Sequence, residues 1–436
     1  MREPPLKLGT AKADITPAAP VPLAGFAHRA GPFEHIAHRL YARIHCFEQQ
    51  DKTGRKASAL LVSADLIWWG SDLVSRLTPV LRERYGFQTM LLHATHTHCG
   101  PQTSSLFTDA LGKPDPGYLE ALEQRLLAGI EEALHNSEAV TVERGSGQCR
   151  IGVNRRKQSG GRIEMAPNEH GQIDPDVTVI RFRTSNGSVK ALFVHYTCHP
   201  TTTGDNEISS EYCGVALERI EQSLGDGAVG AFLQGCCGDI RPALVSDGAF
   251  YRGHRMEVER FGSWLTEEVL RINSLPMEEL APGDLTSKTL ELLLAFDSVP
   301  AIELLEEQAD RSDIHSEWAR LLLREPHRRA ESIPLEITRL DVAKDLSFVA
   351  FNAEMVVDYG LFVKQASHGT MLPLAYTNGM IGYVPTAEQL AQGGYESRDA
   401  APYFGLPSPF RPQIENDIRN AISLITGKEE ETHEPE

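Results

Sequence analysis

Four short segments of the chain end an apolar, strand-like run with a side chain that can bind a metal. They are 91–98, 193–200, 348–354 and 378–383, and they carry His96, His199, Glu354 and Tyr383. Strand ends are where a rigid scaffold presents functional groups on loops. Two histidines, a glutamate and a tyrosine form a nitrogen and oxygen ligand set that suits zinc with an open coordination position. The residue types therefore indicate a zinc hydrolase.

The first segment holds a second histidine two residues after His96. In an extended chain His96 and His98 point to the same face, because side chains alternate along a strand. The pair supplies either two ligands or one ligand and one base, and a lone pair of this kind also occurs as a plain surface or core feature. The turn signal at 100–101 places both rings at a strand end, which favours the functional interpretation. His199, at a strand tip, taken alone fits a structural role better than a catalytic one.

Composition excludes several classes of protein. Of 436 residues, 41% are hydrophobic, which is enough for a substantial core, and 60 acidic against 42 basic residues give a formal charge of −18. This charge argues against nucleic acid as a partner, because nucleic-acid binding needs a basic surface. No apolar run reaches the roughly 18 residues that span a bilayer, so stable membrane insertion is not expected. No signal peptide is visible, so a cytoplasmic location is expected, or secretion if a leader was removed.

Short apolar runs bounded by turn residues predict strands, and apolar residues at helical spacing predict helices between them. The expected strands are 41–47, 57–62, 89–95, 177–182, 189–196, 228–233, 335–341, 348–352 and 373–377. Helical periods cover 73–85 and 119–134. This alternation predicts an α/β fold with a mixed, multi-stranded sheet core, flanking helices and a metal site on loops at strand ends.

One domain over residues 1–426 is expected, because the candidate ligands run from 96 to 383 and sharing one metal requires both ends of the chain. A charged helical segment at about 300–330 is expected at the periphery. The acidic tail 427–436 is expected to be disordered.

Several motifs together resemble one known family. ADITP at 13–17, SAD at 63–65 and ATHTHCGP at 94–101 resemble the neutral/alkaline non-lysosomal ceramidase family, in its N-terminal catalytic domain. Further matches follow in the family's order: NR at 154–155, HPT at 199–201, ISS at 208–210, GD at 238–239, Glu354, YVPT at 383–386 and YE at 395–396.

The resemblance implies a zinc-dependent amidohydrolase that acts on linear amides in lipid, and specifically sphingolipid, metabolism. It implies one zinc ion per chain, with His96, His199, Glu354 and Tyr383 as ligands. His98 would handle protons or the developing oxyanion, and Arg155 and Tyr395 would complete the active site. Metal-activated water would attack the carbonyl of an amide in an N-acyl or lipid-like small molecule.

The chain departs from the family pattern at three places. Arg241 stands where the family has a serine, two residues after Asp239, and Met380 replaces a tyrosine before Tyr383. Few residues follow Tyr395, so the family's C-terminal β-sandwich is not expected. Arg241, Asp239 and Met380 are the predicted substrate-binding positions, and a small or polar N-acyl substrate is expected to be preferred over long-chain ceramide. Arg241 either binds an anionic head group or is a surface arginine paired with an acid.

Alternative functions remain open at this level. The same site would serve a zinc esterase or phosphoesterase, or a non-catalytic relative that keeps zinc for structure. The presence of His98, Arg155 and Tyr395 argues against the last, since a structural site needs no such groups. Adjacent Cys236 and Cys237 lack a recognisable histidine and asparagine partner, so we expect them to be small buried residues rather than nucleophiles.

Overall fold

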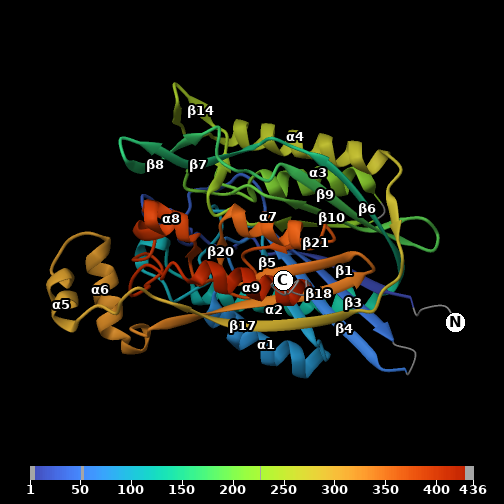
Figure 1. The fold of residues 1–436 in the computed structure, drawn as a ribbon. Helices are drawn as coiled ribbons and strands as arrows, with labels where there is room; N and C mark the ends of the chain where they lie inside the picture. Colours follow the sequence, from blue (N-terminus) through green and yellow to red (C-terminus); the bar gives the residue numbers. More distant parts are fainter. Residues whose placement is uncertain (1–4, 51–53, 226, 428–436) are drawn as a thin grey trace, which may run out of the picture.

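The structure, a computed structural model, describes residues 5–50, 54–225 and 227–427 and is built around two β-sheets (Figure 1). The strands of the larger sheet are β1 (Lys7–Asp14), β3 (Tyr41–Gln50), β4 (Lys56–Ala64), β5 (Thr89–Ala94), β6 (Glu138–Gln148), β9 (Asp176–Thr184), β10 (Val189–Tyr196), β12 (Val229–Gln234) and β16 (Glu278–Leu280). Their order is β12-β10-β9-β6-β1-β3-β4-β5, with β16 paired to β6 outside this path. The β10–β12 and β4–β5 pairs are parallel and the others antiparallel, so the sheet is mixed.

The second sheet packs face to face on the first. Its strands, in spatial order, are β17 (Thr286–Ala295), β18 (Ser332–Ala343), β19 (Leu346–Phe351) and β21 (Met371–Leu374). Side chains of both sheets fill the space between them, where the rings of Phe193 and Phe348 lie 6.3 Å apart. Strand β3 shows why this face is buried: His45 and Phe47 point toward the second sheet, whereas Ile44 and Cys46 point to the opposite face.

Helices cover the outer faces of both sheets. On the larger sheet lie α2 (Pro116–His135), α3 (Glu211–Leu224) and α4 (Arg255–Ser274), and on the smaller lie α7 (Val357–Ala366) and α9 (Ile414–Thr426). The crossover helix α1 (Ser71–Tyr85) joins the parallel strands β4 and β5 and buries Leu73, Leu77 and Leu81. The predicted α/β class with a mixed sheet and flanking helices is confirmed, and the nine expected strands are present, eight of them with altered ends.

The segment expected at the periphery forms α5 (Ile302–Ala309) and α6 (Ile314–Arg324), which project from the body in Figure 1. These helices pack on each other around a small core of Leu305, Trp318 and Leu322. Of the acidic tail, only Gly427 lies within the described residues. In the described part of the chain, no helix has the length and apolarity needed to cross a membrane.

Further strands, most of them only two or three residues long, lie outside the two sheets. They are β2 (His35–Ile36), β7 (Gly152–Ser159), β8 (Arg162–Asn168), β11 (Glu207–Ile208), β13 (Ile240–Pro242), β14 (Val245–Ser246), β15 (Ala249–Phe250), β20 (Glu354–Met355) and β22 (Tyr383–Val384). Strand β7 lies between β13 and β8, and β20 pairs with β22. The helix α8 (Ala387–Gln392) follows β22. These elements carry four of the ten predicted site residues: Arg155, Arg241, Glu354 and Tyr383.

Candidate metal centre

The first histidines lie in a turn rather than on a strand. Strand β5 ends at Ala94, and His96 has a φ of +70°, which an extended chain does not adopt. The expectation that His96 and His98 share one face of an extended segment is therefore wrong, because the segment is not extended at His96. The turn still brings the rings together, with Nε2 to Nε2 at 3.3 Å. Left-handed backbone at a non-glycine residue is costly and is found where surrounding structure enforces it, as at functional sites.

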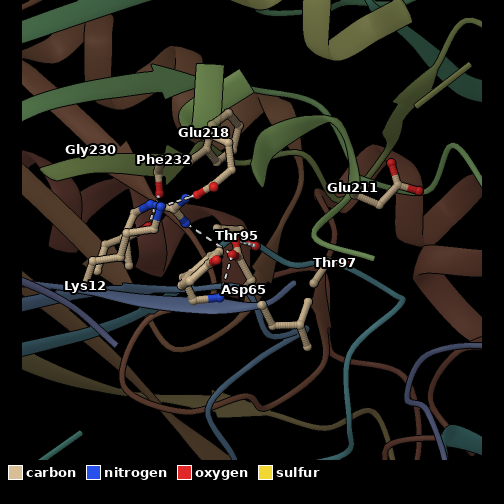
Figure 2. Close-up of polar contacts among 12 residues, drawn as sticks. Lys12, Asp65, Thr95, Thr97, Glu211, Glu218, Gly230 and Phe232 are labelled. Atoms are coloured by element: carbon tan, nitrogen blue, oxygen red, sulfur yellow. Dashed lines mark hydrogen bonds and ion pairs between the residues drawn. The ribbon is translucent and has the colours of Figure 1, made fainter. Parts of the chain in front are cut away.

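A buried ionic network lies beneath this turn. Asp65 accepts hydrogen bonds from the Tyr41 amide (2.9 Å) and from the Thr95 hydroxyl (3.5 Å), the residue just before His96 (Figure 2). The guanidinium of Arg43 contacts Asp65 at 3.1 Å, and both side chains are fully buried. Glu221 on α3 accepts from the same guanidinium at 2.8 Å. The network ties the turn to β3 and α3. It thereby fixes the position of the backbone from which the His96 side chain extends.

His96 and His199 are oriented by backbone carbonyls. Nδ1 of His96 lies 2.7 Å from the carbonyl oxygen of Ile67, and Nδ1 of His199 lies 2.6 Å and 2.8 Å from those of Cys237 and Ile240. A ring that donates from Nδ1 to a carbonyl keeps a lone pair on Nε2, which is how metal-binding histidines are held. Tyr376 also stacks on His96, with ring centroids 3.8 Å apart.

Glu354 completes a converging set of donor atoms. Its Oε2 lies 3.5 Å from Nε2 of His96 and 3.4 Å from Nε2 of His199. Oε2 of Glu354 and Nε2 of His199 are buried and have no hydrogen-bond partner among the described residues. Buried polar atoms are rarely left without a hydrogen-bond partner. Where one is unpaired, a bound ion is one explanation. The donor set therefore fits a divalent metal.

A third histidine belongs to the same cluster. The metal-binding atoms of His96, His98 and His199 lie within 4.8 Å of one another. His98 borders an open cavity, whereas His96 and His199 have no exposed surface. Gly25 packs against His98: a Cβ there would lie 2.5 Å from Nδ1 of that ring. The prediction that His98 stays beside the metal rather than binding it remains a prediction.

Tyr383 is placed by its strand and by Arg155. It lies directly opposite Glu354 in the parallel β20–β22 pair, and its hydroxyl accepts a hydrogen bond from Nη2 of Arg155 at 3.1 Å. Glu396 holds Arg155 at 2.7 Å and Arg156 at 2.6 Å. The ring of Tyr395 lies 5.5 Å from that of Tyr383. The predicted residues Arg155, Tyr383 and Tyr395 are thus brought together at one wall of the site.

Burial sets the protonation states of the cluster. Burial, followed by the Arg155 charge, lowers the pKa of His199 to about 4, so its imidazole is neutral at pH 7. Burial, and then His96 and His199, also lower the pKa of His98 well below its usual value. Burial and the Glu354 carboxylate raise the pKa of Tyr383 well above its usual value. Glu354 stays ionised: although burial opposes it, the two histidines hold the pKa of its carboxyl far below normal.

A cavity of about 430 Å³ opens beside the cluster. His98, Arg155, Tyr383 and Tyr395 line it, and so does Arg241. The other two predicted substrate-binding residues, Met380 and Asp239, are not among the residues that line this cavity. Met380 is buried in the core, where its backbone N–H donates a hydrogen bond to the Ser71 hydroxyl at 3.0 Å. Buried Asp239 accepts from the Val357 amide at 2.9 Å, so it braces the loops around the site.

Comparison with known proteins identifies the family. Residues 6–259, more than half of the chain, match the family described as neutral/alkaline non-lysosomal ceramidase, N-terminal. The chain belongs to this family. Among curated proteins, the neutral ceramidase of Pseudomonas aeruginosa is 27% identical over 254 residues, which are 55% of this chain and 37% of that protein. The neutral ceramidase of Mycobacterium tuberculosis is 24% identical over 263 residues, 54% of this chain and 40% of that protein. The matched stretches thus span less than half of these relatives.

Solved structures show the same fold. The crystal structure of the Pseudomonas aeruginosa neutral ceramidase superposes with a TM-score of 0.73 at 20% identity, covering 97% of this chain and 74% of that one. A structure described as ceramidase complexed with C2 gives the same TM-score at 21% identity, covering 97% and 75%. The match to the neutral/alkaline ceramidase family inferred from the sequence motifs is confirmed.

Several groups that shape this ceramidase-family site were missed by the sequence analysis. Tyr376, Arg156 and Asp65 were given no role, although each holds another site residue in place. Glu396 was visible within the YE motif, but its two arginine partners lie some 240 positions away. The cysteines are as expected: Cys236 and Cys237 are buried, and burial raises the pKa of each thiol well above normal, so neither is a nucleophile at neutral pH.

Proposed function

We propose that this protein is a zinc-dependent hydrolase that cleaves the amide bond of an N-acyl compound. The observation that carries the proposal is the convergence of buried metal-binding atoms of His96, His199 and Glu354. Two of these atoms, His199 Nε2 and Glu354 Oε2, have no hydrogen-bond partner among the residues that the structure describes. Membership of the ceramidase family supports amide cleavage as the reaction. Under the proposal, His96, His199 and Glu354 hold the zinc ion together with Tyr383.

Zinc at such a site polarises a carbonyl oxygen and brings the pKa of a coordinated water to about 7. The residues around it then have separate tasks. His98 faces the cavity, where it would take a proton from the attacking water and pass it to the leaving amine. Tyr395 donates to the oxygen that gains charge. Arg155 holds the Tyr383 oxygen and is itself fixed by Glu396, so this wall is organised before substrate binds.

The proposed substrates are small or polar N-acyl compounds rather than long-chain ceramide. The cavity volume of about 430 Å³ lies toward the lower end of the roughly 300–1,000 Å³ typical of small-molecule sites. Its lining mixes aromatic rings with arginines, and burying an arginine against an alkyl chain is costly. Both features favour a short substrate with polar groups.

A substrate panel tests the proposal. It compares kcat/KM for long-chain ceramide in mixed micelles, for short soluble N-acyl amines and N-acyl amino acids, and for the matching esters. The proposal predicts the highest kcat/KM for a short amide. Faster turnover of ceramide would overturn the substrate preference and leave the chemistry intact. Turnover of esters without amides would show an esterase instead.

A further inference from the structure

The cavity has a charge opposite to that of the whole protein. The chain carries a formal charge of −18, yet three arginines, Arg155, Arg241 and Arg252, line the cavity. Within the described part of the chain, no aspartate or glutamate is among its lining residues. A concave site lined by one sign of charge concentrates ligands of the opposite sign. The cavity is therefore suited to an anion.

The three arginines differ in how their charge is balanced. Arg155 is paired with Glu396 at 2.7 Å. Arg241 and Arg252 form no ion pair with a carboxylate among the residues that the structure describes, and Nε of Arg241 is buried without a hydrogen-bond partner. The guanidinium of Arg241 instead lies 4.3 Å from the Phe250 ring centroid. The interpretation of Arg241 as a surface arginine paired with an acid therefore loses its support.

Arg241 is held close to the metal centre by its strand. It pairs with Val153 on β7, two residues before Arg155, and the side chains of Arg155 and Arg241 both line the cavity. The carbonyl of the preceding residue, Ile240, is 2.8 Å from Nδ1 of His199. Arg241 is thus one residue from the carbonyl that orients a predicted zinc ligand.

Arg252 approaches the same cavity from another loop. Its guanidinium lies 5.1 Å from the Phe26 ring centroid, and the Phe26 ring lies 4.9 Å from that of His98. Nη1 of Arg252 also hydrogen-bonds the His28 ring, at 3.0 Å from Nδ1 of that histidine. The negative charge of Asp205 acts electrostatically on Arg252 and favours its charged form. The Asp205 carboxylate is, however, hydrogen-bonded to His254 at 2.9 Å. One aromatic ring therefore separates Arg252 from His98.

The positive charges act on one another. Burial, followed by the charges of Arg155 and Arg252, lowers the pKa of Arg241 to about 10. Burial, followed by Arg252 and Arg29, likewise lowers the pKa of His28. A bound anion would relieve this repulsion, and a planar guanidinium matches the two oxygens of a carboxylate.

We propose that Arg241 and Arg252 bind a carboxylate carried by the amide substrate, which makes the substrate class N-acyl amino acids or related acyl amides with a free acid. This inference rests on the proposed function, since it identifies the substrate of that same site. Arg241 is then the residue that sets specificity, and Arg252 assists at the more exposed side of the cavity.

Two matched substrate pairs test the inference. The first is N-hexanoylglycine and its methyl ester, with the acid on the amine half, and the second is N-hexylsuccinamic acid and its methyl ester, with the acid on the acyl half. The wild-type protein is expected to show kcat/KM about 10- to 100-fold higher for the acid in one pair, expressed mainly in KM. In Arg241→Gln and Arg252→Gln this ratio is expected to fall toward one. Arg84→Gln, on α1 and outside the cavity lining, removes the same charge and should keep the ratio.

The outcomes separate this inference from the proposed function. Equal or faster amide cleavage of the neutral esters in both pairs would overturn the carboxylate site and leave the hydrolase standing. An Arg241→Gln ratio equal to that of Arg84→Gln would also overturn it. If no amide is cleaved, calorimetric titration of N-hexanoylglycine and N-hexylsuccinamic acid into zinc-loaded wild type and Arg241→Gln decides the question. Weaker binding of an acid to the variant supports the site, and equal binding of both acids to the two proteins overturns it.

Discussion

At the scale of single residues, the decisive feature is a group of buried side chains whose free atoms converge. Nδ1 of both His96 and His199 is occupied by a backbone carbonyl, and Oε2 of Glu354 lies within 3.5 Å of each Nε2. Such an arrangement is unstable as a set of unpaired polar groups and stable as a metal site. The roles of His98 and His199 can be separated by substitution.

His199→Ala is expected to abolish stoichiometric zinc binding, whereas His98→Ala is expected to retain one zinc ion per chain and to lose roughly 10²- to 10⁴-fold in kcat. The reason is that His98 borders the cavity while His199 is enclosed among the converging donors. Elemental analysis of the purified variants together with amide hydrolysis measures both properties. Loss of zinc from His98→Ala would show that His98 is a ligand.

Gly25 supplies a second prediction at this scale. Its φ is +93°, and a Cβ would lie 2.5 Å from Nδ1 of His98, so Gly25→Ala should displace that ring and lower kcat by at least tenfold while zinc is retained. Gly31→Ala is the matched control, because Gly31 has a φ of +73° but no neighbouring atom within 4 Å of a Cβ. Equal activity of the two variants would mean that the contact between Gly25 and His98 has no part in catalysis.

The residue types of the site could be predicted from sequence, but their conformations could not. The motif around His96 indicated a histidine pair at a strand end, yet the positive φ of His96 depends on hydrogen bonds from distant loops. Likewise, Tyr376 stacks on His96 from 280 positions away, and no local pattern shows this. Arg241 was singled out because it departs from a family motif, and only the structure shows what surrounds it.

At the scale of elements, the network between β3, β4 and α3 supports the turn that carries the histidines. Arg43 contacts Asp65 at 3.1 Å and Glu221 at 2.8 Å with no exposed surface of its own. Arg43→Met is expected to lower the free energy of unfolding by about 3–5 kcal/mol, because it removes the cation that balances the charge of the buried Asp65 carboxylate. Denaturant unfolding followed by circular dichroism measures this loss.

Arg84→Met provides the control for this prediction. Arg84 pairs with Glu131 on the surface, where both side chains are about half exposed. Breaking an exposed pair changes stability by only about 0–1 kcal/mol. If the two variants unfold at the same denaturant concentration, the buried network does not stabilise the fold in the way described.

Prediction of the elements succeeded where local pattern determines them and failed where distant partners do. Apolar strands such as β10 and β19 were recognised because both faces are buried in hydrophobic layers. Strand β7 was not predicted, because Asn154, Arg155 and Arg156 give it a polar rather than an apolar pattern. All three are buried, and partners such as Glu396 satisfy their polar groups. Strand β6 was missed because Gly145 and Gly147 weaken its pattern.

At the scale of the whole molecule, the proposed metal site joins parts of the chain that are far apart in sequence. His96 and His199 follow strands of the larger sheet, whereas Glu354 and Tyr383 follow strands of the smaller one. Zinc that binds only the folded state stabilises it, by about 4 kcal/mol at a free concentration 1,000-fold above its Kd. Chelation is therefore expected to lower the Tm of the wild-type protein, and zinc is expected to restore it.

His199→Ala is the control for this effect, since its Tm should not respond to chelator or zinc. Differential scanning calorimetry on both proteins, with and without chelator, gives the comparison. A wild-type Tm that is unchanged after complete metal removal would contradict a metal shared between the two sheets.

The most direct test of the central claim is the rate of amide hydrolysis before and after metal removal. Amine release from a short N-acyl amino acid is measured on the purified protein, on the chelated protein and after one equivalent of zinc is returned. The account predicts that chelation abolishes the activity and that zinc restores it in the wild-type protein but not in His199→Ala. Undiminished amide hydrolysis by protein shown by elemental analysis to be free of metal would contradict it.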